Sequence, residues 1–127
     1  MREVMTVAGP IRPDQMGLTL THEHVLVDFI GADKISPDRY DADDAFNRIL
    51  PHLQRVKDLG CDTFVECTPS FLGKDVRLLQ RLSDTTGLHV ITNVGYYGAA
   101  QDKFLPQHAY EDSPEQLADR WTREWES

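Results

Sequence analysis

The chain has 127 residues, of which 21 are acidic and 13 are lysine or arginine, so its formal net charge is -8 at pH 7. This acidity leaves no basic patch and argues against nucleic acid or an anionic membrane surface as a partner. The sequence contains neither an apolar run of about 20 residues, which a membrane span needs, nor the apolar segment of a secretory signal peptide. We therefore expect a soluble, cytoplasmic protein.

The amino-terminal part predicts a short extended pair followed by the first core strand. Residues 3–16 carry turn chemistry at Gly9-Pro10, around which we expect two extended segments. Residues 18–27 are apolar and β-branched at both ends of the stretch, which is typical of a strand. His22-Glu23-His24 lies in its middle. Because side chains alternate along a strand, the two histidines are expected on one face and the glutamate on the other.

A helix is predicted over about residues 41–59. Asp41 or Asp43 can cap its start, and Gly60 suits the left-handed residue just past its end. Pro51 removes one helical hydrogen bond, so we expect a kink or two shorter helices. Apolar residues recur at intervals of three and four at Phe46, Ile49, Leu50, Leu53, Val56 and Leu59.

The next part of the chain predicts a strand, a helix and another strand. Residues 61–68 and 88–94 are apolar runs, and Glu66 is embedded in the first of them. Together with the first strand and helix, this order predicts a parallel sheet with right-handed crossovers. The helix between the two runs ends before Gly87 and has its apolar positions at Val76, Leu79 and Leu82.

A long loop, residues 95–112, precedes the last predicted helix. Ser113-Pro114-Glu115-Gln116 supplies a capping box with proline at the first helical position. Leu117, Trp121 and Trp125 then form one stripe at helical spacing, which we expect to face the core.

The His22-Glu23-His24 segment is the strongest candidate for chemistry. Two imidazoles about 6–7 Å apart along a strand can converge on one metal ion in front of them. Both histidines lie in an apolar run that we expect to be buried, where a polar ring needs a partner. Taken alone, the pattern also fits two unrelated histidines.

The residues around this pair resemble the first signature of the phosphotriesterase-like metal hydrolases, a family of the amidohydrolase superfamily. That signature is Gly17-Leu18-Thr19-Leu20-Thr21-His22-Glu23-His24-Val25, and Thr6-Val7-Ala8-Gly9-Pro10-Ile11 resembles the segment that leads into it. The resemblance continues in order through Thr63-Phe64-Val65-Glu66-Cys67-Thr68, residues 73–79 and residues 87–97. It covers nearly the whole chain.

The resemblance implies an α/β fold, namely a TIM-type (β/α)8 barrel of parallel strands. Such a barrel needs about 250 residues, so this chain corresponds to about three β/α units. We therefore expect residues 1–127 to form the N-terminal part of a single barrel domain, truncated before the fourth strand.

The resemblance also implies that His22 and His24 ligate one ion of a two-metal centre. Zinc is the usual metal of the family, although two imidazoles suit other divalent transition metals as well. A metal-activated hydroxide would attack an ester, lactone or phosphotriester. The family's remaining ligands and its general base are expected beyond residue 127, so we expect the chain alone to be inactive. None of Lys34, Lys57, Lys74 and Lys103 falls in a predicted strand.

Two further residues are candidates for the same site. The resemblance places an aromatic of the substrate pocket at Tyr97, just beyond the third strand, although packing of the loop onto the rim is an alternative. Glu66 could orient a ligand histidine from the second strand, or else form a structural ion pair or lie at the surface. The three remaining histidines, His52, His89 and His108, are expected to be structural or surface residues.

Two other functions remain open. Another amidohydrolase-type barrel, acting on amides or rings, would also place His-x-His on its first strand. A non-catalytic half-barrel would instead pair with a second polypeptide or with its own copy. The expected partners are therefore a small-molecule ester, lactone or phosphotriester and, as an alternative, a second subunit in a homodimer. Open edge strands favour self-association of the isolated chain.

Overall fold

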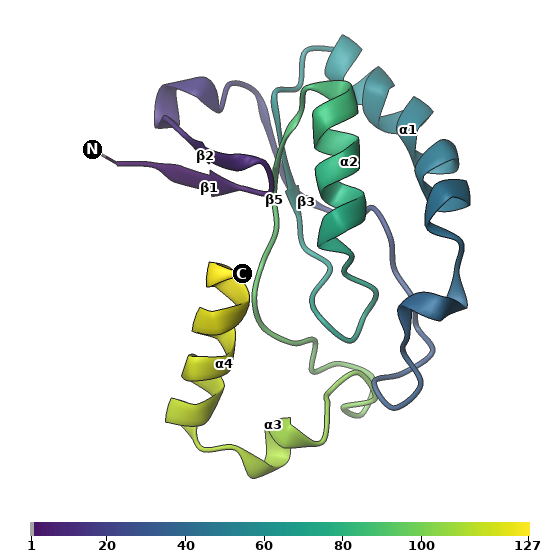
Figure 1. The fold of residues 1–127 in the computed structure, drawn as a ribbon, viewed down its shortest axis with the longest axis vertical. Coiled ribbons are helices and arrows are strands. Elements are labelled where there is room, and N and C mark those ends of the chain that lie inside the picture. Colours follow the sequence, from purple (N-terminus) through teal and green to yellow (C-terminus); the bar gives the residue numbers. More distant parts are fainter. Residues whose placement is uncertain (1) are drawn as a thin grey trace.

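A parallel sheet of three strands lies at the centre of the computed structural model, which describes residues 2–127 (Figure 1). Strands β3 (Thr19–Glu23), β4 (Thr63–Glu66) and β5 (His89–Ile91) are hydrogen-bonded in the order β3-β4-β5. A helix connects each strand to the next: α1 (Ala42–Asp58) and then α2 (Val76–Thr86). The order of elements and the parallel pairing agree with the prediction from sequence.

All three strands are shorter than the apolar runs that predicted them. The first run continues through Val27, but β3 ends at Glu23. The reason is that the Val25 amide donates to the carboxylate of Glu66, at 3.1 Å, instead of joining the ladder of β4. The register between β3 and β4 already shifts between Leu20 and Glu23. His24 therefore lies one residue past the end of the strand.

The remaining elements are β1 (Val4–Thr6), β2 (Gly9–Ile11), the 3-10 helices η1 (Pro13–Gln15) and η2 (Pro37–Arg39), α3 (His108–Glu111) and α4 (Pro114–Glu126). The extended pair predicted at the amino terminus is confirmed as the antiparallel hairpin β1-β2. Its turn is at Val7 and Ala8, whereas Gly9 and Pro10 lie inside β2. The Val7 amide donates to the carbonyl of Val90 at 2.9 Å, so the hairpin attaches to β5.

Helix α1 begins where the sequence predicts and ends one residue earlier. Asp41 is its N-cap, since the carboxylate accepts the Asp44 amide at 2.8 Å. The helix continues through Pro51, so of the two expected outcomes, a kink or two shorter helices, the second does not occur. Leu59, the last apolar residue of the three-and-four pattern, does not belong to the helix. Leu59 lies beyond the last helical residue, next to a turn closed by Gly60 at φ +105°, and is 72% exposed.

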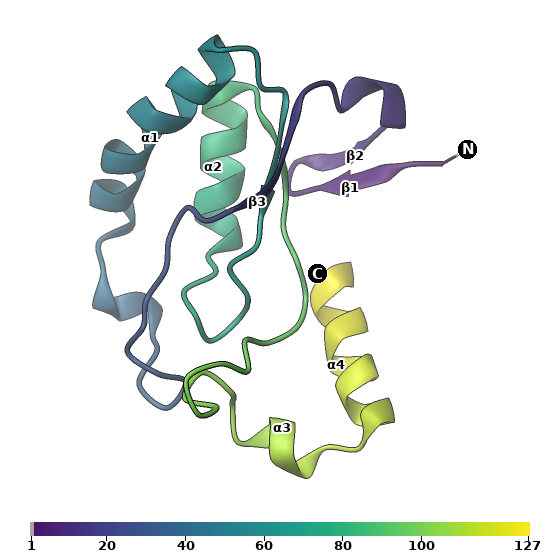
Figure 2. The ribbon, with the colours of Figure 1, turned by 180° about the vertical axis from the view of Figure 1, so that it is seen from behind.

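Helices α1 and α2 cover one face of the sheet, and the core lies between them and the strands (Figures 1 and 2). Full burial of one leucine, valine or phenylalanine side chain contributes about 1.5–3 kcal/mol to stability. Phe64 and Val90 point toward the helices, so their neighbours Val65 and Ile91 face the opposite side of the sheet. The core consists of Leu53, Cys61, Phe64, Leu78, Leu79, Leu82, Leu88 and Val90.

Helix α4 stands apart from α1 and α2, beyond the other side of the strands in both views (Figure 2). Its predicted capping box is confirmed, because Ser113 accepts the Gln116 amide at 3.2 Å and Gln116 accepts the Ser113 amide at 2.8 Å. Trp121 is half-buried, but Trp125 is 60% exposed, so the prediction of a fully core-facing stripe is wrong. Within residues 2–127, no helix combines the length and apolar composition needed to cross a membrane.

Candidate metal site

His22 and His24 lie side by side where β3 ends, at the carboxyl edge of the parallel sheet. Their ring centroids are 5.3 Å apart, and the rings meet edge to face at 67°. Both side chains are exposed rather than buried as the apolar run suggested. The expectation that the two imidazoles share one face is met in space, although only His22 belongs to the strand itself. Exposure leaves both rings accessible to a ligand.

A cavity of about 490 Å³ opens in front of this pair. It lies at the end of the strands from which the β/α loops emerge, which is where barrels of this class build their sites. Apart from the two imidazoles, its walls are largely apolar and aromatic. The lining residues are His22, His24, Val27, Phe29, Cys67, Pro69, Leu72, Asn93, Val94, Gly95, Tyr96 and Tyr97.

A chain of hydrogen bonds runs from His24 to a buried carboxylate. The Nδ1 atom of His24 lies 2.9 Å from the hydroxyl of Thr68. That hydroxyl donates to Oε1 of Glu66, which also accepts the Val25 amide at 3.1 Å. Glu66 is 1% exposed and Thr68 is 0% exposed. Within residues 2–127, the second oxygen of Glu66, Oε2, is buried and has no hydrogen-bond partner.

Asn93 holds the backbone on which this chain of contacts depends. Its side-chain amide donates to the carbonyl of Glu66 at 3.2 Å and to that of Thr68 at 3.1 Å. Asn93 follows β5, so it ties the end of the third core strand to the end of the second. Sequence reasoning missed both Asn93 and Thr68 as members of the site. Each lies two residues past a strand end, where parallel strands bring side chains together. The sequence did not show this, because the predicted strands ran on to Thr68 and Val94.

The loop after β3 crosses the loop after β4 in direct backbone contact. The Asp28 amide donates to the Leu72 carbonyl at 2.8 Å. Gly73 has φ +116°, and a Cβ atom there would lie 2.8 Å from the Asp28 nitrogen. Only glycine therefore fits at this crossing. The Asp28 carboxylate is held by Arg39 at 2.6 Å and by the Ile30 amide at 3.1 Å.

Tyr97 lies on the rim of the cavity, as a pocket aromatic would. It is 42% exposed, and its ring lies 5.7 Å from that of Phe104. Tyr96 turns toward the other side, where its hydroxyl lies 2.6 Å from Nε2 of His108. Its ring also packs against Phe71 and Trp121. Burial is the largest cause of a pKa of Tyr96 above the ordinary value, and the neighbouring Arg120 opposes it.

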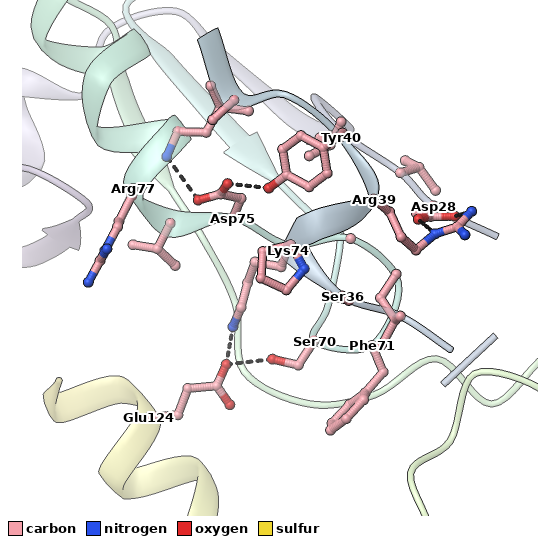
Figure 3. A pocket seen from close by; sticks show the side chains of 18 of the residues that line it. Asp28, Ser36, Arg39, Tyr40, Ser70, Phe71, Lys74, Asp75, Arg77 and Glu124 are labelled. Carbon is pink, nitrogen blue, oxygen red and sulfur yellow. Dashed lines mark hydrogen bonds and ion pairs between the residues drawn. The ribbon is translucent and has the colours of Figure 1, made fainter. Parts of the chain in front are cut away.

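A second, larger cavity of about 1150 Å³ contains neither His22 nor His24 (Figure 3). Its ionic groups are largely paired with one another. Lys74 forms an ion pair with Glu124, which also accepts the hydroxyl of Ser70 at 2.8 Å. Tyr40 donates its hydroxyl to Asp75, and its pKa is raised by burial and by that neighbouring carboxylate. This cavity is lined by one imidazole, that of His108, whereas the smaller cavity is lined by two.

The other sequence candidates stay outside the site. His52 is exposed on α1, His89 belongs to β5 and His108 to α3. Across residues 2–127, no group of three or more histidine, cysteine, aspartate or glutamate side chains is placed to hold a metal. The described residues therefore supply two candidate ligands. None of the four lysines lies on a strand, as predicted.

Comparison with known proteins gives consistent results. The model of the Phosphotriesterase family matches residues 2–127. The chain is 30% identical over 131 residues to a phosphotriesterase homology protein of Mycobacterium tuberculosis, covering 99% of this chain and 40% of that protein. It is 28% identical over 97 residues to an aryldialkylphosphatase of Saccharolobus solfataricus, covering 76% of this chain and 31% of that protein. It is also 28% identical over 122 residues to an N-acetyltaurine hydrolase of Salmo salar, covering 75% of this chain and 35% of that protein.

The fold gives the same result. The structure resembles the organophosphorus hydrolase from Deinococcus radiodurans with a TM-score of 0.67 and 28% identity, over 75% of this chain and 29% of that one. Such neighbours are TIM barrels, so the predicted fold class, the first part of a (β/α)8 barrel, is confirmed. The chain spans less than half the length of the curated relatives named above.

Proposed function

The chain belongs to the phosphotriesterase family, and we propose that it contributes the first two metal ligands and one wall of the substrate pocket to a metal-dependent hydrolase. The ligands are His22 and His24. The observation that carries the proposal is the pairing of these two accessible imidazoles, 5.3 Å apart, at the mouth of a largely apolar cavity.

The residues present fit a divalent transition metal. Imidazole nitrogen is a preferred ligand of zinc and of its neighbours in the first row. His24 has its Nδ1 atom engaged by Thr68, which leaves Nε2 as the nitrogen for coordination. When bound, such a cation supplies Lewis-acid chemistry for hydrolysis. Zinc as the metal, and two ions in the complete site, are part of the proposal.

The other residues bind and orient. Phe29, Val94 and Tyr97 offer apolar and aromatic surface to the organic groups of a substrate and displace water from it. Glu66 and Thr68 support His24 from behind, so that its ring keeps one orientation. The general base is proposed to lie outside residues 1–127.

The proposed substrate is a small ester, lactone or phosphotriester. The names of an aryldialkylphosphatase and of an organophosphorus hydrolase among the similar proteins support phosphotriesters. The name of the similar N-acetyltaurine hydrolase supports an amide as the second candidate. A panel of a phosphotriester, a lactone and an N-acetyl amine separates the two.

The first experiment measures zinc binding to the 127-residue chain. A catalytic zinc normally has three protein ligands, and the described residues offer two, so we expect weak binding that a chelator removes. His22→Ala and His24→Ala should each lower the affinity by more than about tenfold, because each removes a ligand and not merely a supporting residue. His52→Ala, on the exposed face of α1, is the matched control and should bind zinc as the parent does. Unchanged zinc affinity in both ligand variants would refute the site.

The second experiment measures hydrolysis. We expect no turnover by the chain alone above that of the free ion. In a longer polypeptide that joins this chain to the rest of a family barrel, we expect hydrolysis that His24→Ala abolishes together with metal content. Turnover by the purified 127-residue chain, lost in His22→Ala, would show that two ligands suffice.

A further inference from the structure

We propose that Thr68 and Glu66 select the tautomer of His24, placing the proton on Nδ1 and leaving the Nε2 lone pair free. Only the use of that lone pair as a metal ligand rests on the function proposed above. Thr68 and Glu66 are positioning residues in this proposal, since they act on a cation through the histidine.

The selection follows from counting the protons along the chain of contacts. A threonine hydroxyl has one proton to donate and lone pairs with which to accept. Thr68 donates its proton to Oε1 of Glu66. Toward His24, 2.9 Å away, the same oxygen can then only accept. The Nδ1 atom of His24 must therefore carry a proton, and a neutral imidazole carries its single proton on one nitrogen.

Burial makes the arrangement selective. Glu66 and Thr68 are 1% and 0% exposed, so water does not compete for the hydroxyl proton or for its lone pairs. Oε1 of Glu66 also accepts the amide of Val25, the residue that follows His24 in the chain. One carboxylate oxygen thus fixes both the backbone after the histidine and the group that holds its ring. Asn93 fixes the backbone of Thr68 from the neighbouring strand.

The test measures the tautomer of each histidine in the metal-free chain by long-range ¹H–¹⁵N correlation NMR. A pH of about 8.5 keeps an ordinary imidazole, with a pKa of about 6.5, neutral. In the parent chain His24 should be protonated on Nδ1. Thr68→Val keeps the shape but removes the hydroxyl, so His24 should become a mixture of tautomers. Thr68→Ser keeps the hydroxyl and should preserve the parent pattern.

A second pair of variants tests the carboxylate. Glu66→Met removes the acceptor, which leaves the Thr68 proton free to point at His24, so the tautomer should shift toward Nε2–H. Glu66→Gln retains an acceptor oxygen for Thr68 and should keep the proton on Nδ1. Glu66 does not touch the imidazole in either case. A change in the tautomer therefore reports the relay, meaning the effect of Glu66 that passes through Thr68 to His24, and not a lost contact with the ring. His22 serves as the internal reference.

Thr63→Val is the control for a general loss of stability. It deletes a buried threonine hydroxyl at the opposite end of β4, one that donates to the Met16 carbonyl at 2.6 Å and not to the chain of contacts behind His24. It should leave the His24 tautomer unchanged. A parent chain with His24 protonated on Nε2, or a Thr68→Val chain with the parent pattern, would overturn the proposal. The first of these outcomes is measured on the parent chain, so it does not depend on whether any variant folds.

Zinc titration of the same chains separates this inference from the proposed function. If zinc binds through Nε2, Thr68→Val and Glu66→Met should weaken binding by about 10–100-fold, and Thr68→Ser should not. If the parent shows the expected tautomer but binds no zinc, the proposed function fails and the relay stands. If zinc binds to the parent and to Thr68→Val alike, the relay has no bearing on the metal and that part of the proposal is refuted.

Discussion

At the scale of single residues, the Asp28–Arg39 pair shows how the loop after β3 is held in place. The Arg39 guanidinium donates to the Asp28 carboxylate and holds its pKa below the ordinary value, against a smaller opposing effect of burial. Because the folded pKa is the lower one, the unfolded chain binds the proton more tightly. The pair therefore contributes fully above the ordinary aspartate pKa of about 3.9, and its contribution is lost as the pH falls through the folded value.

We expect Asp28→Asn to lower the melting temperature at pH 7 and the difference from the parent to shrink as the pH falls from about 4 toward 3. Thermal unfolding by circular dichroism at a series of pH values measures this. Asp33→Asn lies in the same loop, is exposed, and should be close to the parent throughout. If the melting temperatures of Asp28→Asn and the parent differed by the same amount down to pH 3, the charge of Asp28 would not be what stabilises the loop.

The residues of the site were foreseeable only in part. His22, His24, Tyr97 and Glu66 were recognised from local pattern and resemblance, and the structure brings the first three to one cavity and Glu66 directly behind it. Their roles in catalysis stay predictions. Thr68 was not foreseeable, because its contact with His24 spans 44 positions of sequence and depends on the parallel register of β3 and β4.

At the scale of elements, helix α4 is held to the rest of the structure by the packing of Trp121 against Tyr96 and by an ion pair whose lysine is buried. Lys74 has a side chain that is only 6% exposed, and it bonds to Glu124 and to the carbonyl of Asn93 (Figure 3). Glu124 is 30% exposed and also accepts the Ser70 hydroxyl. Neutralising Glu124 leaves the ammonium of Lys74 without its counter-charge.

We expect Glu124→Gln to destabilise the docking of α4 by about 1–3 kcal/mol, the cost of leaving a buried group without its partner. The chain has two tryptophans, Trp121 and Trp125, and both lie on α4. Tryptophan fluorescence therefore reports this helix, whereas far-ultraviolet circular dichroism is dominated by α1 and α2. In the variant, the fluorescence transition should move to lower denaturant than the dichroism transition.

Glu126→Gln is the matched control for this helix. Glu126 is exposed and makes no ion pair within residues 2–127, so its neutralisation should shift neither transition. Coincident transitions in Glu124→Gln, at the denaturant concentration of the parent, would show that α4 does not depend on the Lys74 ion pair.

The elements themselves were largely predictable, because capping and periodicity are local signals. Asp41, Gly87 and the capping box at Ser113 begin or end helices as the sequence indicated. The ends of the strands were not predictable, because an apolar residue such as Val25 serves equally in a strand or in a buried loop. Its amide finds a side-chain acceptor, Glu66, that no local pattern reveals. Trp125 likewise has helical spacing but no neighbouring layer to cover it.

At the scale of the whole molecule, the sheet is covered by α1 and α2 on one side only. Within residues 2–127, β3 has β4 as its one strand partner, and β5 gains a single hydrogen bond from the hairpin at Val7. The far side of the sheet presents Val65 and Ile91. Open strand edges and an apolar sheet face are both templates for association.

We expect the 127-residue chain to self-associate, as the homodimer alternative requires, with an average mass in sedimentation equilibrium that rises with protein concentration. Ile91→Glu should suppress this association because it places a charge on the uncovered face. Leu59→Glu removes an apolar side chain that is 72% exposed at the far end of α1 and should have no such effect. A parent chain that stays monomeric, with slowly exchanging amides in β3 and β5, would show that the three strands need no further cover.

The backbone crossing at Gly73 lies in the wall of the larger cavity and joins the loops after β3 and β4, from which Val27 and Leu72 reach the histidine cavity. Any side chain there would collide with the main chain of Asp28, so a saturation library at this codon would return only defective folds, whatever substrate was used for selection. The wall of the histidine cavity that Tyr97 forms is different, because Tyr97 is 42% exposed on a loop without regular structure. Directed evolution toward new substrates should therefore gather its gains in the loop that follows β5 and leave the crossing at Gly73 untouched.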